Sequence, residues 1–207
     1  MSGPPRRPVL AGLATALATG GCARMLIGDR TPPTEFRLMP EVELASDLPA
    51  VDWILIVAEP NAEGALDSER IAVLSDGVRI QPLAEAIWSD RPTAMLQFAI
   101  VQAFQRSGRL PAVGTDRDAL PGRYLLQSTL DAFQLEPEAQ SFAVDLSLHA
   151  RLLRLPTREV VSAAEFSRRV PTAGNSNEAA VAAFNRAAGG VLADLVAWTL
   201  RRGRARR

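Results

Sequence analysis

The chain has 207 residues, 47% of them hydrophobic, which is enough for one domain with a substantial core and short for two. Its 23 basic and 23 acidic residues balance, and this balance excludes a protein that binds nucleic acid by overall charge. A single cysteine and a single histidine exclude a disulfide within the chain and a metal cluster built from Cys and His.

The N-terminus has the pattern of an export signal. Arg6 and Arg7 precede an apolar run from Val9 to Ala18, which has the length of a signal-peptide core and is too short for a membrane span. Small residues at 19–21 stand directly before Cys22, as in the lipobox that lipoprotein signal peptidase recognises. We therefore predict a lipoprotein signal peptide at residues 1–21 and lipidation of the Cys22 thiol.

Other interpretations of this segment stay open. The lipobox departs from the standard pattern at Thr19, where an aliphatic residue is usual, so an ordinary signal peptide with an incidental cysteine is one alternative and a buried N-terminal helix is another. The pair Arg6-Arg7 leaves twin-arginine export open beside general secretion. Several acyl chains on Cys22 would anchor the protein stably, whereas one would not. Ala23 favours the outer membrane where the enteric sorting rule holds, because that rule retains proteins with Asp at this position.

Residues 22–50 are predicted to be a lipidated N-terminus and a flexible tether, since residues 28–50 are rich in proline and acidic side chains. One short strand is expected within it at residues 36–38. A folded domain is predicted for residues 51–200. Its first strands are the apolar runs 53–58 and 70–74, and Asp76-Gly77 then predicts a hairpin into 78–80.

Two helices are predicted. The first follows the apolar residues 86–88, with Ser89 and Asp90 as capping residues, Pro92 in its first turn and Gly108 at its end. The second is opened by a pair that resembles a capping box, Asn175 and Glu178, and it keeps apolar residues on one face as far as Trp198.

Long strands lie between the helices. Residues 124–135 predict a strand with an irregularity near Ala132-Phe133, and residues 142–152 alternate apolar and polar side chains with period two. A turn at 156–158 leads into a returning strand at 159–170. The order of elements predicts an α+β fold: a single antiparallel or mixed sheet with two helices packed on one face.

Catalytic patterns are missing from the sequence. It contains no glycine-rich phosphate loop and no nucleophile elbow. The nearest carboxylate pairs, Glu136 with Glu138 and Asp116 with Asp118, are interpreted as solvated turns, and His149 lies on the polar face of a strand without a partner to orient it. We therefore expect no enzyme activity, no metal site and no cofactor beyond the lipid on Cys22.

The C-terminal residues 201–207 form a basic tail, RRGRARR. We interpret it as a frayed, solvated end. Acidic lipid headgroups or an acidic partner are the alternative ligands for it in an exported protein.

The whole pattern resembles the auxiliary lipoproteins of ABC-type lipid transport systems, the PqiC/YmbA-like family encoded beside MCE-domain proteins. Four stretches carry the resemblance. They are Cys22 with the segment 36–38, the strand and hairpin from Arg70 to Trp88 followed by Pro92, the strand 124–136, and the strand pair 144–166 with the helix 178–198. The chain departs from the family at Gln81-Pro82-Leu83, where aromatic residues are usual near the hairpin.

The resemblance implies a function. It predicts an accessory lipoprotein anchored in the outer membrane on the periplasmic side, which binds the MCE component of the transporter. The resemblance leaves open whether copies of the protein assemble into a homo-oligomer. Trp88 matches a family tryptophan and is our candidate for the partner interface, with core packing as its alternative. The competing function is a structural envelope lipoprotein that assists assembly of an outer-membrane complex. A direct lipid carrier would need an apolar cavity between helices and sheet.

Overall fold

The computed structural model describes residues 32–204, and the residues from Pro33 onward form one compact unit. Its first elements are β1 (Thr34–Phe36), β2 (Leu55–Val57), β3 (Asn61–Ala62), β4 (Arg70–Ser75), β5 (Arg79–Trp88) and α1 (Pro92–Ser107). The remaining elements are β6 (Val113–Thr115), β7 (Tyr124–Pro137), β8 (Phe142–Arg154), β9 (Glu159–Pro171) and α2 (Asn177–Arg204). The signal peptide, Cys22 and residues 205–207 lie outside the described residues.

Strand β7 organises a single mixed sheet of nine strands. On one side it pairs antiparallel with β8, which pairs antiparallel with β9. On its other side β7 pairs parallel with three short strands in turn, β2, β3 and β4. Strand β4 continues the sheet through β5 to β1, and β2 continues it to β6.

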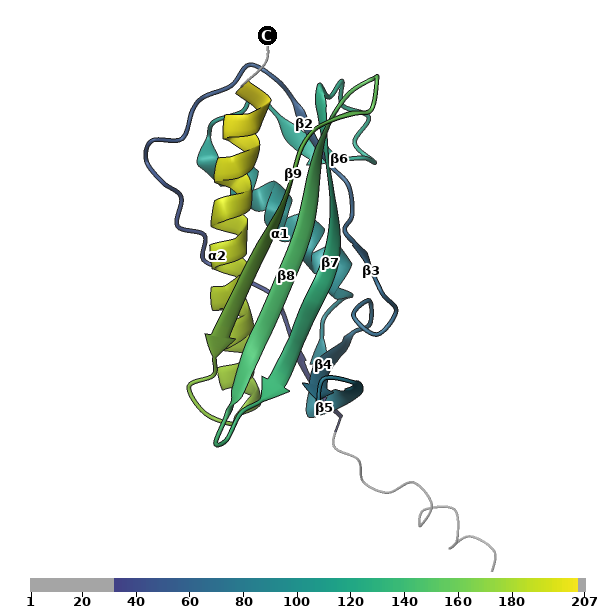
Figure 1. Cartoon of the computed structure of the whole chain (residues 1–207), viewed down its shortest axis with the longest axis vertical. Helices are drawn as coiled ribbons and strands as arrows, with labels where there is room; N and C mark the ends of the chain where they lie inside the picture. Colours follow the sequence, from purple (N-terminus) through teal and green to yellow (C-terminus); the bar gives the residue numbers. More distant parts are fainter. Residues whose placement is uncertain (1–31, 205–207) are drawn as a thin grey trace, which may run out of the picture. The chain divides into compact units, whose positions relative to one another are not determined.

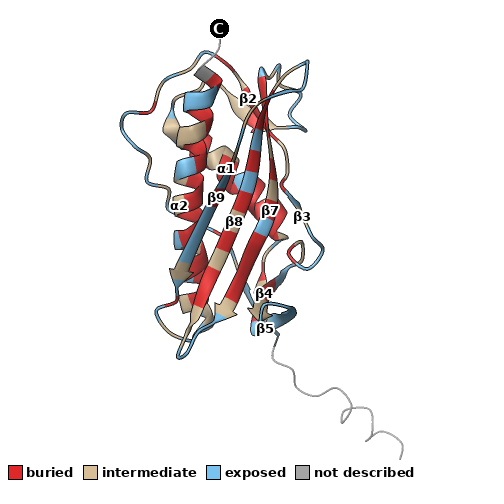
Figure 2. Ribbon diagram, viewed as in Figure 1, coloured by how far each residue is buried: buried red, intermediate tan, exposed pale blue. Residues whose placement is uncertain are grey.

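Both helices pack on the same face of this sheet, as predicted from the sequence (Figure 1). One hydrophobic core joins the inward side chains of the sheet to α1 and α2, and its largest members are almost fully buried. Figure 2 shows this burial along β7, β8 and the sheet-facing side of α2. Helix α2 is long and apolar enough to cross a membrane, but 61% of its most apolar window is buried in the domain, so its apolar residues serve the core.

The local signals in the sequence are mostly confirmed. Asp76 and Gly77 both have positive φ (54° and 70°) and lie in the three-residue turn 76–78 that joins the paired residues Ser75 and Arg79, so the predicted hairpin is present. The irregularity predicted in β7 is a bulge between Leu130 and Ala132. Helix α1 begins at Pro92 and ends at Ser107, and the capping residue Gly108 has a φ of 60°, which suits glycine.

The helix caps differ from the prediction by one residue each. Arg91 is the residue before α1, and its side chain makes no capping hydrogen bond; Asp90 instead accepts a bond from the Arg91 backbone N–H at 2.7 Å. At α2 the Ser176 hydroxyl accepts from the Ala179 backbone N–H at 3.2 Å, which is the role predicted for Asn175.

Residues 37–50, hereafter the strap, pack on the domain instead of forming part of a flexible tether. Leu38 and Leu48 are buried at its two ends, and Val42 and Leu44 contact the core between them. The physical reason is that these four apolar side chains bury their surface against the core of the domain. The proline and acidic content of the segment does not reveal that this core surface is available. The domain therefore begins at Pro33 and not at residue 51.

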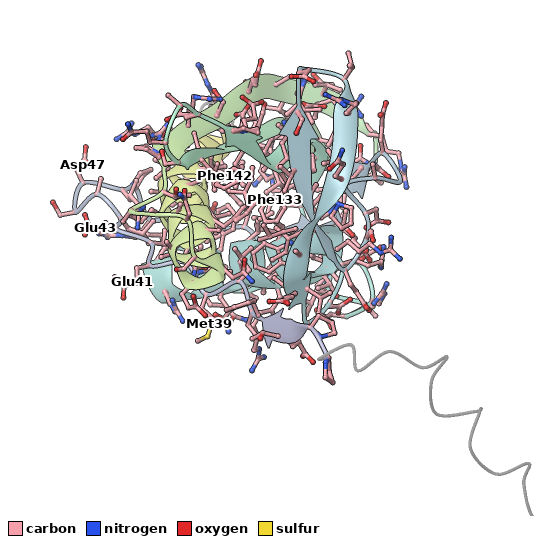
Figure 3. All side chains as sticks on the ribbon, turned by 90° about the horizontal axis from the view of Figure 1, so that it is seen from below. Met39, Glu41, Glu43, Asp47, Phe133 and Phe142 are labelled. Atoms are coloured by element: carbon pink, nitrogen blue, oxygen red, sulfur yellow. The ribbon has the colours of Figure 1, made fainter. Side chains whose placement is uncertain are left out.

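The acidic residues of the strap point away from the core. Figure 3 shows Glu41, Glu43 and Asp47 projecting into solvent. Glutamates alternate with Val42 and Leu44, so the strap presents one apolar edge and one acidic edge.

The C-terminal end is more ordered than a frayed tail. Residues 201–204 continue α2, and the Tyr124 hydroxyl donates to the Gly203 carbonyl oxygen at 3.2 Å. A Cβ on Gly203 would lie 2.3 Å from the Trp53 ring, so the absence of a side chain lets the helix end pack against the indole.

The strap crosses α2 at Gly189. A Cβ at this position would lie 2.3 Å from the carbonyl oxygen of Glu41, a backbone atom with little freedom to move. At Gly190 the nearest atom is Arg168 Nε at 2.9 Å, on a flexible side chain. Gly189 therefore has a packing role in a helix interior, where glycine is otherwise unfavourable.

Exchanging each glycine for alanine separates these two environments. We expect Gly189→Ala to lower the free energy of unfolding by about 1–2 kcal/mol, because displacing the strap outweighs the gain in helix propensity. Gly190→Ala should be neutral or stabilising by up to about 1 kcal/mol, because the Arg168 side chain can move aside. Urea denaturation of both variants checks this, and equal stabilities would contradict the role given to Gly189.

Candidate functional site

An open groove of about 880 Å³ runs between the strap and the solvent side of α1. Its strap wall is formed by Leu38, Met39, Pro40, Glu41 and Val42. Its helix wall is formed by Ala94, Met95, Phe98, Ala99, Gln102, Ala103 and Arg106. The groove exists because the strap packs on the domain beside α1, so its walls come from two segments far apart in the sequence.

Helix α1 serves two surfaces at once. Leu96, Ile100 and Phe104 are buried in the core, with exposures of 1% or less. Between them, residues spaced three or four apart line the groove, with Met95 at its floor and Phe98 at its rim. This explains why the sequence of α1 has no clean polar face.

Two large apolar side chains stand at the rim. Phe98 is 61% exposed and Met39 is 71% exposed, and Figure 3 shows Met39 pointing away from the domain. Single exposed apolar residues are ordinary, but two that flank one groove favour a binding surface. Aromatic and methionine side chains are also enriched at the centre of protein interfaces.

The charged residues of the groove are of both signs. Arg37 and Arg106 line it together with Glu35, Glu41 and Asp90. A site for a small anion would concentrate positive charge, whereas an apolar centre with a mixed polar rim is typical of a surface for another protein.

Trp88, the predicted interface residue, lies in the core and not at a surface. It is 1% exposed, its ring lies edge-on to Phe184 with centroids 5.1 Å apart, and it is tilted against Phe133 at 5.6 Å. The interface role is therefore wrong and the alternative, core packing, is correct. The physical reason is that Phe133 of β7 and Phe184 of α2, whose rings also contact each other with centroids 4.7 Å apart, form one buried cluster with the Trp88 ring.

A polar cluster holds the start of α1. The Arg91 guanidinium donates to Asp67 Oδ2 at 2.8 Å and to Glu59 Oε1 at 2.7 Å, and the Thr93 hydroxyl donates to Asp67 Oδ1 at 2.6 Å. These carboxylates raise the pKa of Arg91, first through its hydrogen bond with Asp67. The cluster ties the segments around β3 to the start of α1. No short sequence motif predicts this cluster, because its members are far apart in the sequence.

The other titratable residues predicted as solvated do not converge on a site. His149 is exposed on β8, opposite Thr129 and Glu165. Glu136 lies in β7 and not in a turn, and it pairs with Arg169, which also contacts Glu138.

The remaining carboxylates have local roles. Asp118 accepts from the Thr115 backbone N–H at 2.6 Å, and burial followed by the charge of Glu136 raises the pKa of Asp145. Within residues 32–204 there is no group of three or more His, Cys, Asp or Glu side chains placed to hold a metal.

A family described as the ABC-type transport auxiliary lipoprotein component matches residues 37–196, from the strap to the last turns of α2. The chain belongs to this family. It is a family of lipoproteins auxiliary to transport and not an enzyme family, so the resemblance inferred from the sequence is confirmed.

The chain is also similar to solved structures. Protein XCC0632 from Xanthomonas campestris is 32% identical with a TM-score of 0.77, and the match covers 82% of this chain and 96% of that one. An uncharacterised protein is 16% identical with a TM-score of 0.61 and coverages of 82% and 97%, which shows the same fold. PelC from Paraburkholderia phytofirmans, a dodecamer, is 14% identical with a TM-score of 0.46, covering 77% and 93%. No curated protein sequence matches the chain.

Replacing Trp88 tests its place in the core. We expect Trp88→Ala to lower the free energy of unfolding by about 3–5 kcal/mol, because it empties a site enclosed by two phenylalanine rings. Trp198→Ala is the control, since Trp198 is partly exposed and contacts the Phe166 ring at one edge. Its loss should be about 1–2 kcal/mol. Urea unfolding followed by circular dichroism measures both, and a Trp88 variant as stable as the Trp198 variant would refute the assignment.

Proposed function

We propose that this protein is an accessory lipoprotein of an MCE-associated, ABC-type lipid transport system, anchored in the outer membrane and facing the periplasm. It acts by binding the MCE component. The observation that carries the proposal is the family match, which covers almost the whole described domain, including both walls of the groove.

The anchor in this proposal is Cys22. It is the only cysteine of the chain and follows a basic pair, an apolar core and small residues. Acyl chains on its thiol and amino group supply enough buried methylenes for stable attachment. Ala23 supports the outer membrane as the destination.

The groove beside α1 is the proposed binding surface for the MCE component. Phe98 and Met39 offer apolar contact area at its rim, and the charged residues around them can satisfy polar groups of a polypeptide. The proposal favours docking over carrying lipid inside the domain. Between the helices and the sheet, where a carrier needs a cavity, the core is filled by side chains such as Ile100, Phe133 and Phe184.

Removal of the anchor gives the first test. In the wild-type protein, mass spectrometry should find acyl chains on an N-terminal Cys22. Cys22→Ala should move the protein from the membrane to the soluble fraction, because no other acyl attachment is proposed. Wild-type protein that is unmodified and as soluble as the variant would sink the lipoprotein assignment.

Changing the groove rim gives the second test. Phe98→Glu in the acylated protein should reduce the MCE-domain protein that co-purifies from detergent-solubilised envelope by about tenfold, since it puts a charge at the centre of an apolar contact. Val160→Glu is the matched control, because Val160 is 51% exposed on β9 and is not part of the groove. Capture of only porins or assembly machinery by the unaltered protein would instead favour a structural envelope lipoprotein.

A further inference from the structure

The β4–β5 hairpin exposes apolar side chains at its tip. Val78 is 81% exposed and Ile80 is 49% exposed, although a chain of this size has room to bury them. The charged residues of the tip, Asp76 and Arg79, form an ion pair with each other, so their charges offset locally. The tip is therefore apolar with little net charge.

The tip lies at the end of the sheet where β7 finishes and turns back into β8. Strand β4 runs parallel to β7 with Val73 opposite Leu135, which brings Ser75 level with Pro137, the last residue of β7. The turn after Ser75 extends past that point. Figure 1 shows β4 and β5 at the end of the domain where β7 finishes.

The chain also enters the domain from this end. Strand β1 pairs parallel with β5, with Thr34 opposite Ala86, and β5 runs away from the tip. The residues before Thr34 therefore approach from the tip side. Arg70 of β4 lies opposite Ile87, so about five residues of strand, or about 15 Å, separate the level of Thr34 from the tip.

The distance to the proposed anchor is short. Eleven residues lead from Cys22 to Pro33, and a fully extended chain of this length spans at most about 40 Å. The membrane surface that holds the acyl chains must therefore lie within about 40 Å of Pro33, which enters the domain on the side of the tip that carries Val78 and Ile80. Such tethering raises the local concentration of lipid at the tip, so a contact that is weak by itself becomes populated.

We propose that the β4–β5 hairpin is a second membrane contact, in which Val78 and Ile80 enter the headgroup region of the bilayer that holds Cys22. This rests on the proposed lipidation of Cys22. A lipid surface fits better than a second copy of the chain, because two side chains on a projecting turn bury far less than the roughly 800 Å² per partner of a stable protein interface. A fluid surface also requires no complementary shape from its partner.

A single introduced cysteine tests the contact in the acylated protein. The Cys22 sulfur is consumed by lipidation, so Val78→Cys provides one free thiol for a polarity-sensitive fluorophore. The protein is reconstituted in vesicles of phosphatidylethanolamine and phosphatidylglycerol, with and without brominated acyl chains. Brominated lipid should quench the label at position 78 at least about twofold more than a label at Val160→Cys.

Val160 is a suitable control because it lies at the other end of the sheet. It pairs with Leu153, which pairs with Leu125 of β7, ten positions before Leu135. This corresponds to about 30 Å along the strand. Equal quenching at positions 78 and 160 in protein that is acylated and bound to vesicles would contradict the hairpin contact. It would not contradict the proposed lipidation of Cys22. Protein without acyl chains on Cys22 would overturn both proposals.

A second variant keeps all native cysteine chemistry. Val78→Ser combined with Ile80→Ser should speed transfer of the acylated protein between vesicles by about tenfold, because the apolar contact area at the tip is lost. Both positions are exposed, so the fold should not change. Transfer as slow as that of a Val160→Ser control would contradict the proposal.

Discussion

The backbone carbonyl of Glu41 occupies the space that a side chain on Gly189 would need, and the position of the strap depends on this close approach. It lets the strap lie against α2, where the Met39 backbone N–H also donates to Asn185 Oδ1 at 2.7 Å. The strap in turn buries Leu38 and Leu48 and forms one wall of the groove beside α1. The proposed binding surface therefore depends on a glycine that does not itself line the groove.

The two proposed contacts use different parts of one rigid domain. The hairpin tip lies at the end where the chain enters, and the groove lies along α1 and the strap. Both surfaces are small in apolar area, which suits a protein held in place by a covalent anchor and stabilised by a core of its own. A binding role also agrees with the carboxylates of Glu59, Asp67 and Glu136, which are used in ion pairs with Arg91 and Arg169.

The sequence predicts those parts of the fold whose signals are local. Three such predictions are confirmed: the strand from the alternation at Phe142 to Leu152, the Asp76-Gly77 turn, and the end of α1 before its glycine. Each of them depends only on residues close together in the sequence. The strap could not be predicted in this way. Its apolar residues are few, they stand among prolines and glutamates, and the surface that buries them is provided by a helix far along the chain.

Trp88 shows the same limit, since a tryptophan between a strand and a helix does not reveal that Phe133 and Phe184 will pack against it. The groove follows the strap and was missed with it; the lack of a clean polar face on α1 was its only signal.

The central claim is that the groove beside α1 contacts the MCE component of a transporter. Photo-crosslinking in living cells tests it most directly, with a photoreactive amino acid at Phe98 on the groove rim and, in a separate strain, at Val160 on β9. The account predicts a crosslink from position 98 to an MCE-domain protein and none to that protein from position 160. Crosslinks from position 98 only to other envelope proteins, or equal crosslinking to the MCE protein from both positions, would contradict it.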